Sequence, residues 1–137
     1  MTAQEARRRF ATARVARLAT ADADGVPHLV PVVFAVREDT VVVAVDNKPK
    51  RTTALKRLAN VRANPRVALL ADHYEEDWDA LWWARADGSG RVAEPGSPDA
   101  LQAVDLLAER YPQHRAEPPE GPVLVVAVTR WSGWSAR

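Results

Sequence analysis

Cysteine is absent from the 137-residue sequence, which excludes disulfide bonds, thiolate metal sites and a cysteine nucleophile. Histidine is scarce: His28, His73 and His114 are far apart in the chain and form no ligand pair at helical spacing, so we expect no zinc site. Long apolar runs are also missing, so no segment is expected to cross a bilayer. The polar, arginine-rich amino terminus does not resemble a signal peptide. We therefore expect a cytoplasmic protein without a membrane partner.

An excess of one charge is missing as well. Nineteen basic and eighteen acidic residues leave a net charge of +1, which does not support binding of nucleic acid through bulk positive charge. The basic residues therefore matter only where they cluster. The sequence has no Gly-x-Gly-x-x-Gly after a predicted strand and no Walker-type lysine loop, so neither a dinucleotide-binding fold nor a nucleotide hydrolase is supported.

The apolar pattern predicts a small, mainly β protein. A length of 137 residues with 47% hydrophobic residues fits one globular domain, residues 1–137. Predicted strands occupy residues 14–21, 27–36, 40–45, 66–71, 80–86 and 123–128. Most of them follow one another as hairpins, so the sheet should be mainly antiparallel and closed into a small barrel of six or seven strands.

Three helices are expected around this barrel. The capping-box pattern Thr2-Ala3-Gln4-Glu5 predicts a first helix to about residue 11. A second helix follows residue 52 and ends before Asn64-Pro65, and a third starts at Ser97-Pro98 and runs to about residue 111. The stretch 87–90 (DGSG) has the composition of a hairpin turn. Residues 112–122 read as a proline-rich connection, and residues 130–134 as an aromatic terminal segment.

The predicted strand 27–36 is apolar on both of its faces. His28, Val30 and Val32 alternate along it with Leu29 and Pro31. A strand tolerates this pattern only when both sides are covered, so one face should meet the protein interior and the other a partner subunit or a flat ligand. Pro31 cannot donate a hydrogen bond to a neighbouring strand, and it therefore indicates an edge position or a bulge.

Positive charge gathers at one place, the junction between the strand that ends near Val45 and the second helix. Lys48, Lys50 and Arg51 precede the start of that helix, where the positive pole of the helix dipole disfavours cations and favours anions. The free backbone N–H groups there, together with the hydroxyl of Thr52, suit phosphate oxygens. The junction predicts an anion site, although a solvated basic turn fits the same residues equally well.

Five tryptophans are many for so short a chain. Trp82 and Trp83 are adjacent in a predicted strand and point to opposite faces, so one of them should face another subunit, a ligand or water. Core or interface packing is the expected role of most of the five. Trp78 differs, because an aromatic residue between Asp77 and Asp79 in an acidic loop suits a lid over a flat ligand.

The pattern assigns no catalytic residue. His73 and Tyr74 are the candidates for proton transfer near the acidic loop, and an ordinary hydrogen-bonding role is the expected one for His73. Neither a Ser/His/Asp arrangement nor a pair of spaced carboxylates is recognisable. If the protein catalyses a reaction, we expect a bound cofactor to supply the chemistry and the protein to supply position and electrostatics.

Several of these segments occur in the same order in one known family. The chain resembles the split-barrel flavin and deazaflavin proteins of the pyridoxamine 5′-phosphate oxidase-like superfamily in ARLAT followed by Asp-Gly, in GVPHLVPVVFAV, in the basic junction and in ANPRVALLAD. It is similar to a narrower, actinobacterial group of deazaflavin (coenzyme F-420) dependent oxidoreductases in VDNKPKR, RANPRVALLADHYEEDW and ALWW. Each segment alone is a weak sign of the family, and the segments together, in this order, are a more specific one.

The resemblance implies a six-stranded antiparallel split β-barrel (an FMN-binding split barrel) that forms a homodimer, with two cofactor sites in clefts between subunits. It implies coenzyme F-420 as the cofactor, with FMN as the alternative. The cofactor phosphate would be held by residues after the third strand: Lys48, Lys50, Arg51 and Thr52. The tricyclic ring would lie against the second and third strands: Val30, Pro31, Val32 and Val45, with Asp46 and Asn47. Trp78 and either Trp131 or Trp134 would contact the ring from the partner chain.

The sequence departs from the oxidase that gives the family its name. His28 stands where that enzyme has a cofactor-binding arginine at the start of its second strand, and the carboxyl-terminal arginine-histidine substrate motif is absent. Pyridoxamine phosphate is therefore not an expected substrate, whereas FMN binding stays open. The longer acidic tail of a deazaflavin would use additional positive charge, for which Lys56 and Arg57 are candidates.

Two kinds of function follow from this resemblance. One is an oxidoreductase that moves a hydride between a reduced deazaflavin and a small unsaturated or carbonyl-containing acceptor. The other is a non-catalytic carrier of flavin, deazaflavin or heme on the same scaffold. A nucleic-acid-binding module fits poorly with the near-zero net charge.

Overall fold

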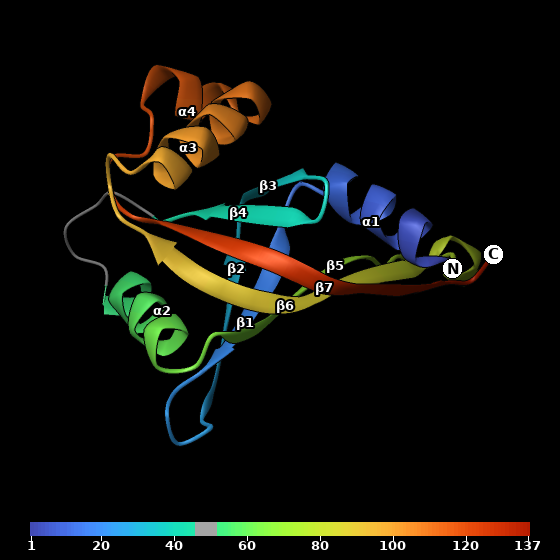
Figure 1. Ribbon diagram of the computed structural model, residues 1–137. Coiled ribbons are helices and arrows are strands. Elements are labelled where there is room, and N and C mark those ends of the chain that lie inside the picture. The colour runs from blue at the N-terminus through green and yellow to red at the C-terminus, as the bar shows by residue number, and fades with distance from the viewer. Residues whose placement is uncertain (46–51) are drawn as a thin grey trace.

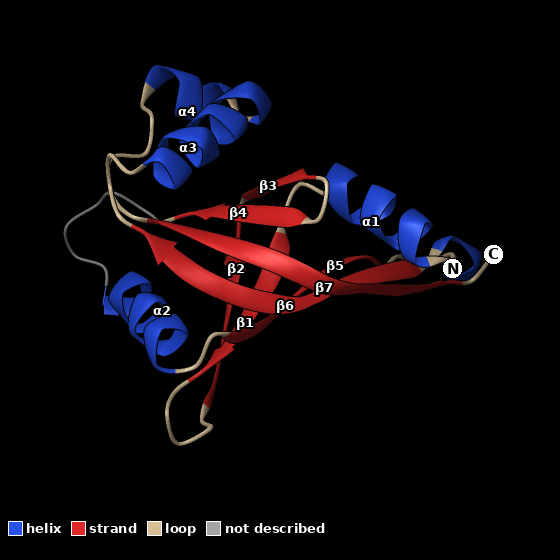
Figure 2. Ribbon diagram, in the orientation of Figure 1, coloured by secondary structure: helices blue, strands red, loops and turns tan. Residues whose placement is uncertain are grey.

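The computed structural model describes residues 1–45 and 52–137, the side chains of residues 52–55 excepted. Four α-helices and seven strands are arranged as one curved sheet with helices around it (Figures 1 and 2). The helices are α1 (Ala3–Thr12), α2 (Thr52–Ala63), α3 (Pro98–Arg110) and α4 (Pro112–Ala116), with a 3-10 turn η1 (Trp78–Ala80). The strands are β1 (Ala16–Ala21), β2 (Pro27–Val32), β3 (Phe34–Arg37), β4 (Thr40–Ala44), β5 (Arg66–His73), β6 (Trp82–Ala93) and β7 (Val123–Ser135).

The seven strands form one sheet in the order β2-β1-β5-β6-β7-β4-β3, and all neighbours are antiparallel. Its two edge strands, β2 and β3, are separated in the chain by Val33 alone. The sheet must therefore curl until its edges meet at that residue, which is the arrangement of a split barrel. The predicted barrel is confirmed, with seven strands instead of six because the expected strand 27–36 divides at Val33. Pro31 lies on an edge strand, as expected of a residue without an N–H donor.

Alternation along the strands separates two hydrophobic cores. Phe34, Val43 and Leu124 lie opposite one another in the barrel interior, because side chains two apart share a face. Phe10 of α1 closes this core, with its ring 4.8 Å from that of Phe34 and 5.4 Å from that of Trp131. The intervening residues of β3, β4 and β7 face outward and bury the apolar side of α3.

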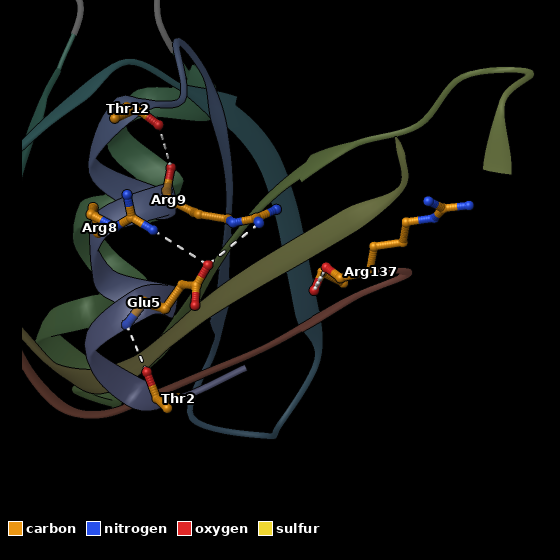
Figure 3. A network of polar contacts seen from close by, with 7 residues as sticks. Thr2, Glu5, Arg8, Arg9, Thr12 and Arg137 are labelled. Carbon is orange, nitrogen blue, oxygen red and sulfur yellow. Dashed lines mark hydrogen bonds and ion pairs between the residues drawn. The ribbon is translucent and has the colours of Figure 1, made fainter. Parts of the chain in front are cut away.

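Helix α1 begins where the sequence predicts it. The hydroxyl of Thr2 accepts a hydrogen bond from the backbone N–H of Glu5 at 3.1 Å (Figure 3), which satisfies one of the free donors at a helix start. The carboxylate of Glu5 pairs with Arg8 at 3.3 Å and Arg9 at 3.4 Å, the neighbours one turn on. The cap fixes the direction of α1 and thereby places Phe10 in the barrel.

The hairpin turn expected at residues 87–90 is wrong. β6 runs straight through these residues and pairs with β7, with a register shift at Asp87 and Gly88. A side chain at Gly88 would place its Cβ 2.3 Å from the carbonyl oxygen of Ala127, so glycine is needed there for close approach of two backbones. A glycine that marks a bulge has the same local composition as one that marks a turn.

Two further expectations differ from the structure near the carboxyl end. The proline-rich connection contains a short helix, α4, with Pro112 at its first turn, a position that proline favours because its missing N–H is not needed there. The aromatic terminal segment is the second half of β7, which pairs with β6 as far as Ser135. Trp134 therefore lies opposite Trp83 in the sheet.

Candidate functional site

An open groove of about 450 Å³ lies beside the point where β2 passes into β3. Strand residues form one wall of this groove, and that wall is entirely apolar. The second wall comes from α4 and the segment after it, with Arg57 of α2 at the margin. The lining residues are Pro31, Val32, Val33, Ala44, Val45, Arg57, Gln113, His114, Glu117 and Pro119. The groove therefore lies between an apolar strand surface and a polar helical surface.

A hydrogen-bonded latch holds the two walls together. The hydroxyl of Tyr111, at the junction of α3 and α4, donates to the carbonyl oxygen of Phe34 at 2.7 Å and accepts from the N–H of Phe34 at 3.1 Å. The guanidinium of Arg110 donates to the same carbonyl at 2.9 Å and to the carbonyl of Ala13. It also lies 4.6 Å from the centre of the Phe34 ring, within the range of a cation–π contact. Phe34 directly follows the groove residue Val33, so the latch ties α4 to the strand wall.

Helix α2 is anchored to the barrel by polar contacts. Lys56 lies 4.0 Å from the carboxylate of Asp22, in the turn between β1 and β2. The backbone N–H groups of Val26 and Asp24 each donate to Asp22 at 2.9 Å. The hydrogen bond from Val26, together with that from Asp24 and the charge of Lys56, lowers the pKa of Asp22 below its usual value against the opposing effect of desolvation. The turn next to α2 is therefore held by an ionised carboxylate.

The structure brings together part of the predicted cofactor site. Pro31, Val32 and Val45 line the one groove, whereas Val30 packs against the barrel core. Asp46, Asn47, Lys48, Lys50 and Arg51 lie outside the described residues, as does the side chain of Thr52. Val45 directly precedes them in the sequence. The predicted phosphate-binding role of this junction stays a prediction.

Trp78 lies far from the groove within one chain. It is 76% exposed and sits just before Trp82, the first residue of β6. The other end of β6, Ala93, pairs with Val123, which in turn pairs with Ala44 of the groove. Trp82 and Ala93 are eleven residues apart, or about 36 Å along the strand, and Figure 1 shows α2 and the carboxyl terminus at opposite ends of the sheet. Trp78 of the same chain is therefore too far away to contact a ligand in this groove.

The other tryptophans have distinct positions. Trp131 is buried, and its Nε1 donates to the carboxylate of Asp39 at 2.9 Å. Trp134 is 43% exposed and is the carboxyl-terminal aromatic residue that a partner could meet. Trp82 packs against the barrel core, and Trp83 is half-buried on the opposite face. This agrees with the expectation that one of the adjacent pair faces away from the core.

An open face extends over β1, β2 and β5 on the outside of the barrel. Leu29, the most exposed of its apolar side chains at 66%, lies opposite Ala19 of β1. In the next row Arg17 stands between Pro31 and Leu70, both exposed. Arg17 pairs with Asp72 at 3.1 Å. This open face carries exposed apolar side chains with the ion pair of Arg17 and Asp72 among them.

The polar wall of the groove was missed by sequence reasoning. Gln113, His114 and Glu117 belong to the segment interpreted as a connection. Pro112 at a helix start was the available signal, but five residues are too few to show helical periodicity. His28 lies on β2 opposite Thr20, with its Nδ1 buried and without a hydrogen-bond partner in the described part of the chain. The His73 ring hydrogen-bonds to Glu75, the ordinary role expected for it.

Two absences concern the described residues. Residues 1–45 and 52–137 contain no group of three or more His, Cys, Asp or Glu side chains arranged to hold a metal ion. No helix in the same ranges is long and apolar enough to cross a membrane.

The comparisons with known proteins agree on the fold. A sequence model of the family described as pyridoxamine 5′-phosphate oxidase matches residues 2–135. A conserved hypothetical protein from Mycobacterium tuberculosis has 24% identity and a TM-score of 0.75, over 100% of this chain and 86% of that chain. An FAD-binding protein from Mesorhizobium loti has 22% identity and a TM-score of 0.75, over 97% and 94%. A heme storage protein from Vibrio cholerae has 16% identity and a TM-score of 0.69, over 98% and 95%. No curated protein matches the sequence.

Proposed function

This chain belongs to the pyridoxamine 5′-phosphate oxidase family, and from that membership we propose that it is an oxidoreductase that uses a phosphate-bearing tricyclic cofactor. Coenzyme F-420 is the cofactor we propose first, as in the actinobacterial group that the sequence resembles, and FMN is the alternative. When bound, the cofactor would supply a hydride to a small carbonyl-containing or otherwise unsaturated acceptor. The observation that carries the proposal is the groove beside Val33 and Val45.

The groove fits such a cofactor in size and lining. About 450 Å³ lies within the usual range of ligand pockets, which are mostly apolar with a few polar groups. The strand wall of Pro31, Val32 and Val45 would take the flat ring and exclude water from one side of it. The chain then continues directly from Val45 into the basic junction, where the sequence predicts a phosphate site at the start of α2. Ring site and phosphate site would thus be adjacent in the chain.

The surroundings of α2 favour the deazaflavin. Its acidic tail is longer than that of FMN and would use positive charge beyond the phosphate site. Arg57 lines the groove, and Lys56 lies one residue before it at the edge of the turn that contains Asp22. The Mesorhizobium neighbour, described as FAD-binding, supports flavin chemistry on this fold in general.

We propose a homodimer as the working unit. The open face exposes Leu29, Pro31 and Leu70 on both sides of β1, and exposed apolar side chains gathered on one face are typical of an interface. A second copy of the chain would cover this face. It would also be the source of Trp78 and Trp134, the exposed aromatic side chains that one chain alone cannot bring to its own groove.

A heme carrier is the second candidate function. His114 lines the groove opposite an apolar strand wall, and an imidazole beside an apolar surface is a common heme ligand. The Vibrio neighbour is described as a heme storage protein. In this reading the protein would bind its ligand without turning over an acceptor.

Titration of the purified protein with F-420, FMN and heme separates these functions. We expect saturable binding of F-420, followed by cofactor absorbance and tryptophan fluorescence. Reduced F-420 should then be oxidised in the presence of at least one quinone, enone or nitro compound. Tight heme binding with no turnover of any acceptor would favour the carrier, and failure of F-420 and FMN to bind would contradict the proposed oxidoreductase.

Replacement of Lys50 and Arg51 by alanine tests the phosphate site. Each hydrogen bond to a charged group is worth about 1.5–3 kcal/mol, so the double variant should bind the cofactor at least about tenfold more weakly. Arg62→Ala is the matched control, because Arg62 lies in the last turn of the same helix and pairs with Glu94 at the surface. Unchanged affinity in the double variant would mean that Lys50 and Arg51 do not bind the cofactor phosphate.

A further inference from the structure

We propose that His114 donates a proton to the acceptor, and that the acceptor is a molecule whose carbonyl oxygen reaches the α4 wall of the groove. This inference rests on the proposed function, since it concerns the same groove. It assigns a catalytic role to a residue in a segment where the sequence shows no motif.

The position of His114 suits this role. It lines the groove from α4, across from the apolar wall of Val32 and Val45. Its side chain is half-buried, so it is in contact with both the protein and the groove. Among the described groups, none makes a hydrogen bond to its ring nitrogens. Both nitrogens are therefore open to a ligand, in contrast to His73, whose ring is engaged by Glu75.

The imidazole is also held in place. The ring of Tyr111 meets it edge-on, with 5.6 Å between ring centres, a favoured geometry for aromatic pairs. Tyr111 in turn is fixed by its two hydrogen bonds to Phe34. The same contacts fix Val33, the neighbour of Phe34 on the opposite wall. The latch therefore sets the distance between His114 and the strand wall on which the ring would lie.

The reaction needs a proton as well as a hydride. Reduction of a carbonyl group adds a hydride, supplied by the reduced deazaflavin or flavin, to carbon, and the C=O π bond breaks toward oxygen. The oxygen then carries the electron pair and needs a proton to become a hydroxyl group. The imidazolium of His114 would donate that proton from a ring nitrogen and become neutral imidazole, which takes up a proton from water. Electrons and protons balance with the named hydride donor as the reductant.

The other charged groups of the groove do not fit this task as well. Glu117 directly follows α4, the helix of His114, and Arg57 lines the groove from α2. Tyr111 and Arg110, at the end of α3, are engaged by the backbone of Phe34. The described residues of β2, β3 and β4 that line the groove contribute no titratable side chain. A carboxylate accepts hydrogen bonds and arginine does not give up its proton in proteins, whereas the imidazole of histidine is the most frequent general acid in catalysis.

The test compares two kinds of hydride acceptor in the cofactor-loaded protein. An enone or a carbonyl compound needs a proton, whereas a triarylmethane dye cation becomes neutral on taking up a hydride and needs none. His114→Gln should lower kcat for the first kind by about a hundredfold, within the usual range for a lost general acid. It should leave dye reduction unchanged, and it should flatten the dependence of kcat/KM on pH that the wild type shows with the carbonyl compound. Ala116→Gln, an exposed change on the same helix, should leave both rates unchanged.

A readout without turnover completes the test. In protein labelled with ¹⁵N-histidine, the ring resonance of His114 is identified by its disappearance in His114→Gln. It should shift when F-420 or FMN is added, and the variant should bind the cofactor as tightly as the wild type. If the cofactor binds but the resonance stays unmoved, or if both acceptors slow equally, the role of His114 is wrong while the proposed function stands. If no cofactor binds, both are overturned.

Discussion

Asn60 of α2 and Thr20 of β1 are joined by a hydrogen bond of 3.0 Å from the side-chain amide to the hydroxyl oxygen. Both side chains are buried. A buried polar pair of this kind holds one register between a helix and a strand, because any shift leaves both groups without partners. The contact therefore fixes the helix whose amino-terminal end follows the predicted phosphate-binding residues.

Thr20→Val should destabilise the protein by about 1–3 kcal/mol, because it leaves the buried amide of Asn60 unsatisfied in a space of the same shape. Urea unfolding followed by tryptophan fluorescence gives the free energy of unfolding. Thr20→Ser keeps the hydroxyl and should lose less than Thr20→Val. Equal losses in the two variants would mean that the hydroxyl does not stabilise α2.

Tyr111→Phe removes the hydroxyl of the latch and keeps the ring beside His114. The N–H of Phe34 then loses its partner, so we expect a loss of about 1–2 kcal/mol in the free energy of unfolding. Reduction of a carbonyl acceptor should slow more than reduction of a triarylmethane dye, because the distance between α4 and the strand wall is no longer fixed. An unchanged ratio of the two rates would argue against the latch as a positioning device.

Leu29→Glu should convert the proposed dimer into a monomer. A carboxylate in the middle of the open face would have to be desolvated without a partner. Leu101→Glu is the control, since Leu101 is likewise exposed, at 57%, but lies on α3. Sedimentation velocity of the wild type and both variants gives the oligomeric states, and we expect only Leu29→Glu to be a monomer. A wild type that sediments as a monomer at working concentration would contradict the homodimer.

Gly88→Ala should cost about 1–3 kcal/mol, the usual effect of forcing atoms into a filled space. Its Cβ would meet the Ala127 carbonyl oxygen at 2.3 Å, and neither backbone can yield without breaking the β6–β7 ladder. At Gly90 the nearest atom is a methyl of Val61 at 3.4 Å, so Gly90→Ala should be tolerated. Thermal unfolding of the two variants gives the comparison, and similar melting temperatures would contradict the close-approach argument.

Asp22→Asn should change the pH dependence of stability. The pKa of Asp22 is lowered in the folded protein, first by the N–H of Val26, so its ionised form stabilises the fold at any pH above the unfolded value near 4. That contribution is lost as pH falls through the lowered pKa. The stability difference between wild type and Asp22→Asn should therefore be constant above about pH 5 and shrink below about pH 4. A difference that grows on acidification would contradict the sign of the shift.

The sequence predicted the elements whose signals are local. Thr2 and Ser97 mark helix starts that the structure confirms, because a side-chain cap acts within three residues of its own position. Pro31 likewise marked an edge strand, because the missing N–H that keeps it from a central position belongs to the residue itself. The turn expected at Gly88 was wrong, since that glycine is required by a backbone 39 residues further on in the chain. Long-range contacts of this kind leave no trace in the neighbouring residues.

The candidate site also has one part that local sequence signals indicate and another that they do not. Its strand wall contains Pro31, Val32 and Val45, which the family resemblance singled out, and the two apolar faces of the edge strand indicated a second surface there. Its helical wall could not, because α4 is placed by the contact of Tyr111 with Phe34, 77 residues away. The distance between Trp78 and the groove likewise depends on the strand order. Alternation accounts for the apolar strand wall of the groove, and the binding of a cofactor there stays a prediction.

The strand order has a consequence for synthesis of the protein. β7 lies between β6 and β4 in the sheet, yet it leaves the ribosome after the other six strands. Until it does, the β1–β2 and β3–β4 hairpins cannot be joined into one sheet, and β4 and β6 each present an unpaired edge to the cell. Nascent chains that stall before residue 123 are thus the form most exposed to mispairing and to capture by chaperones.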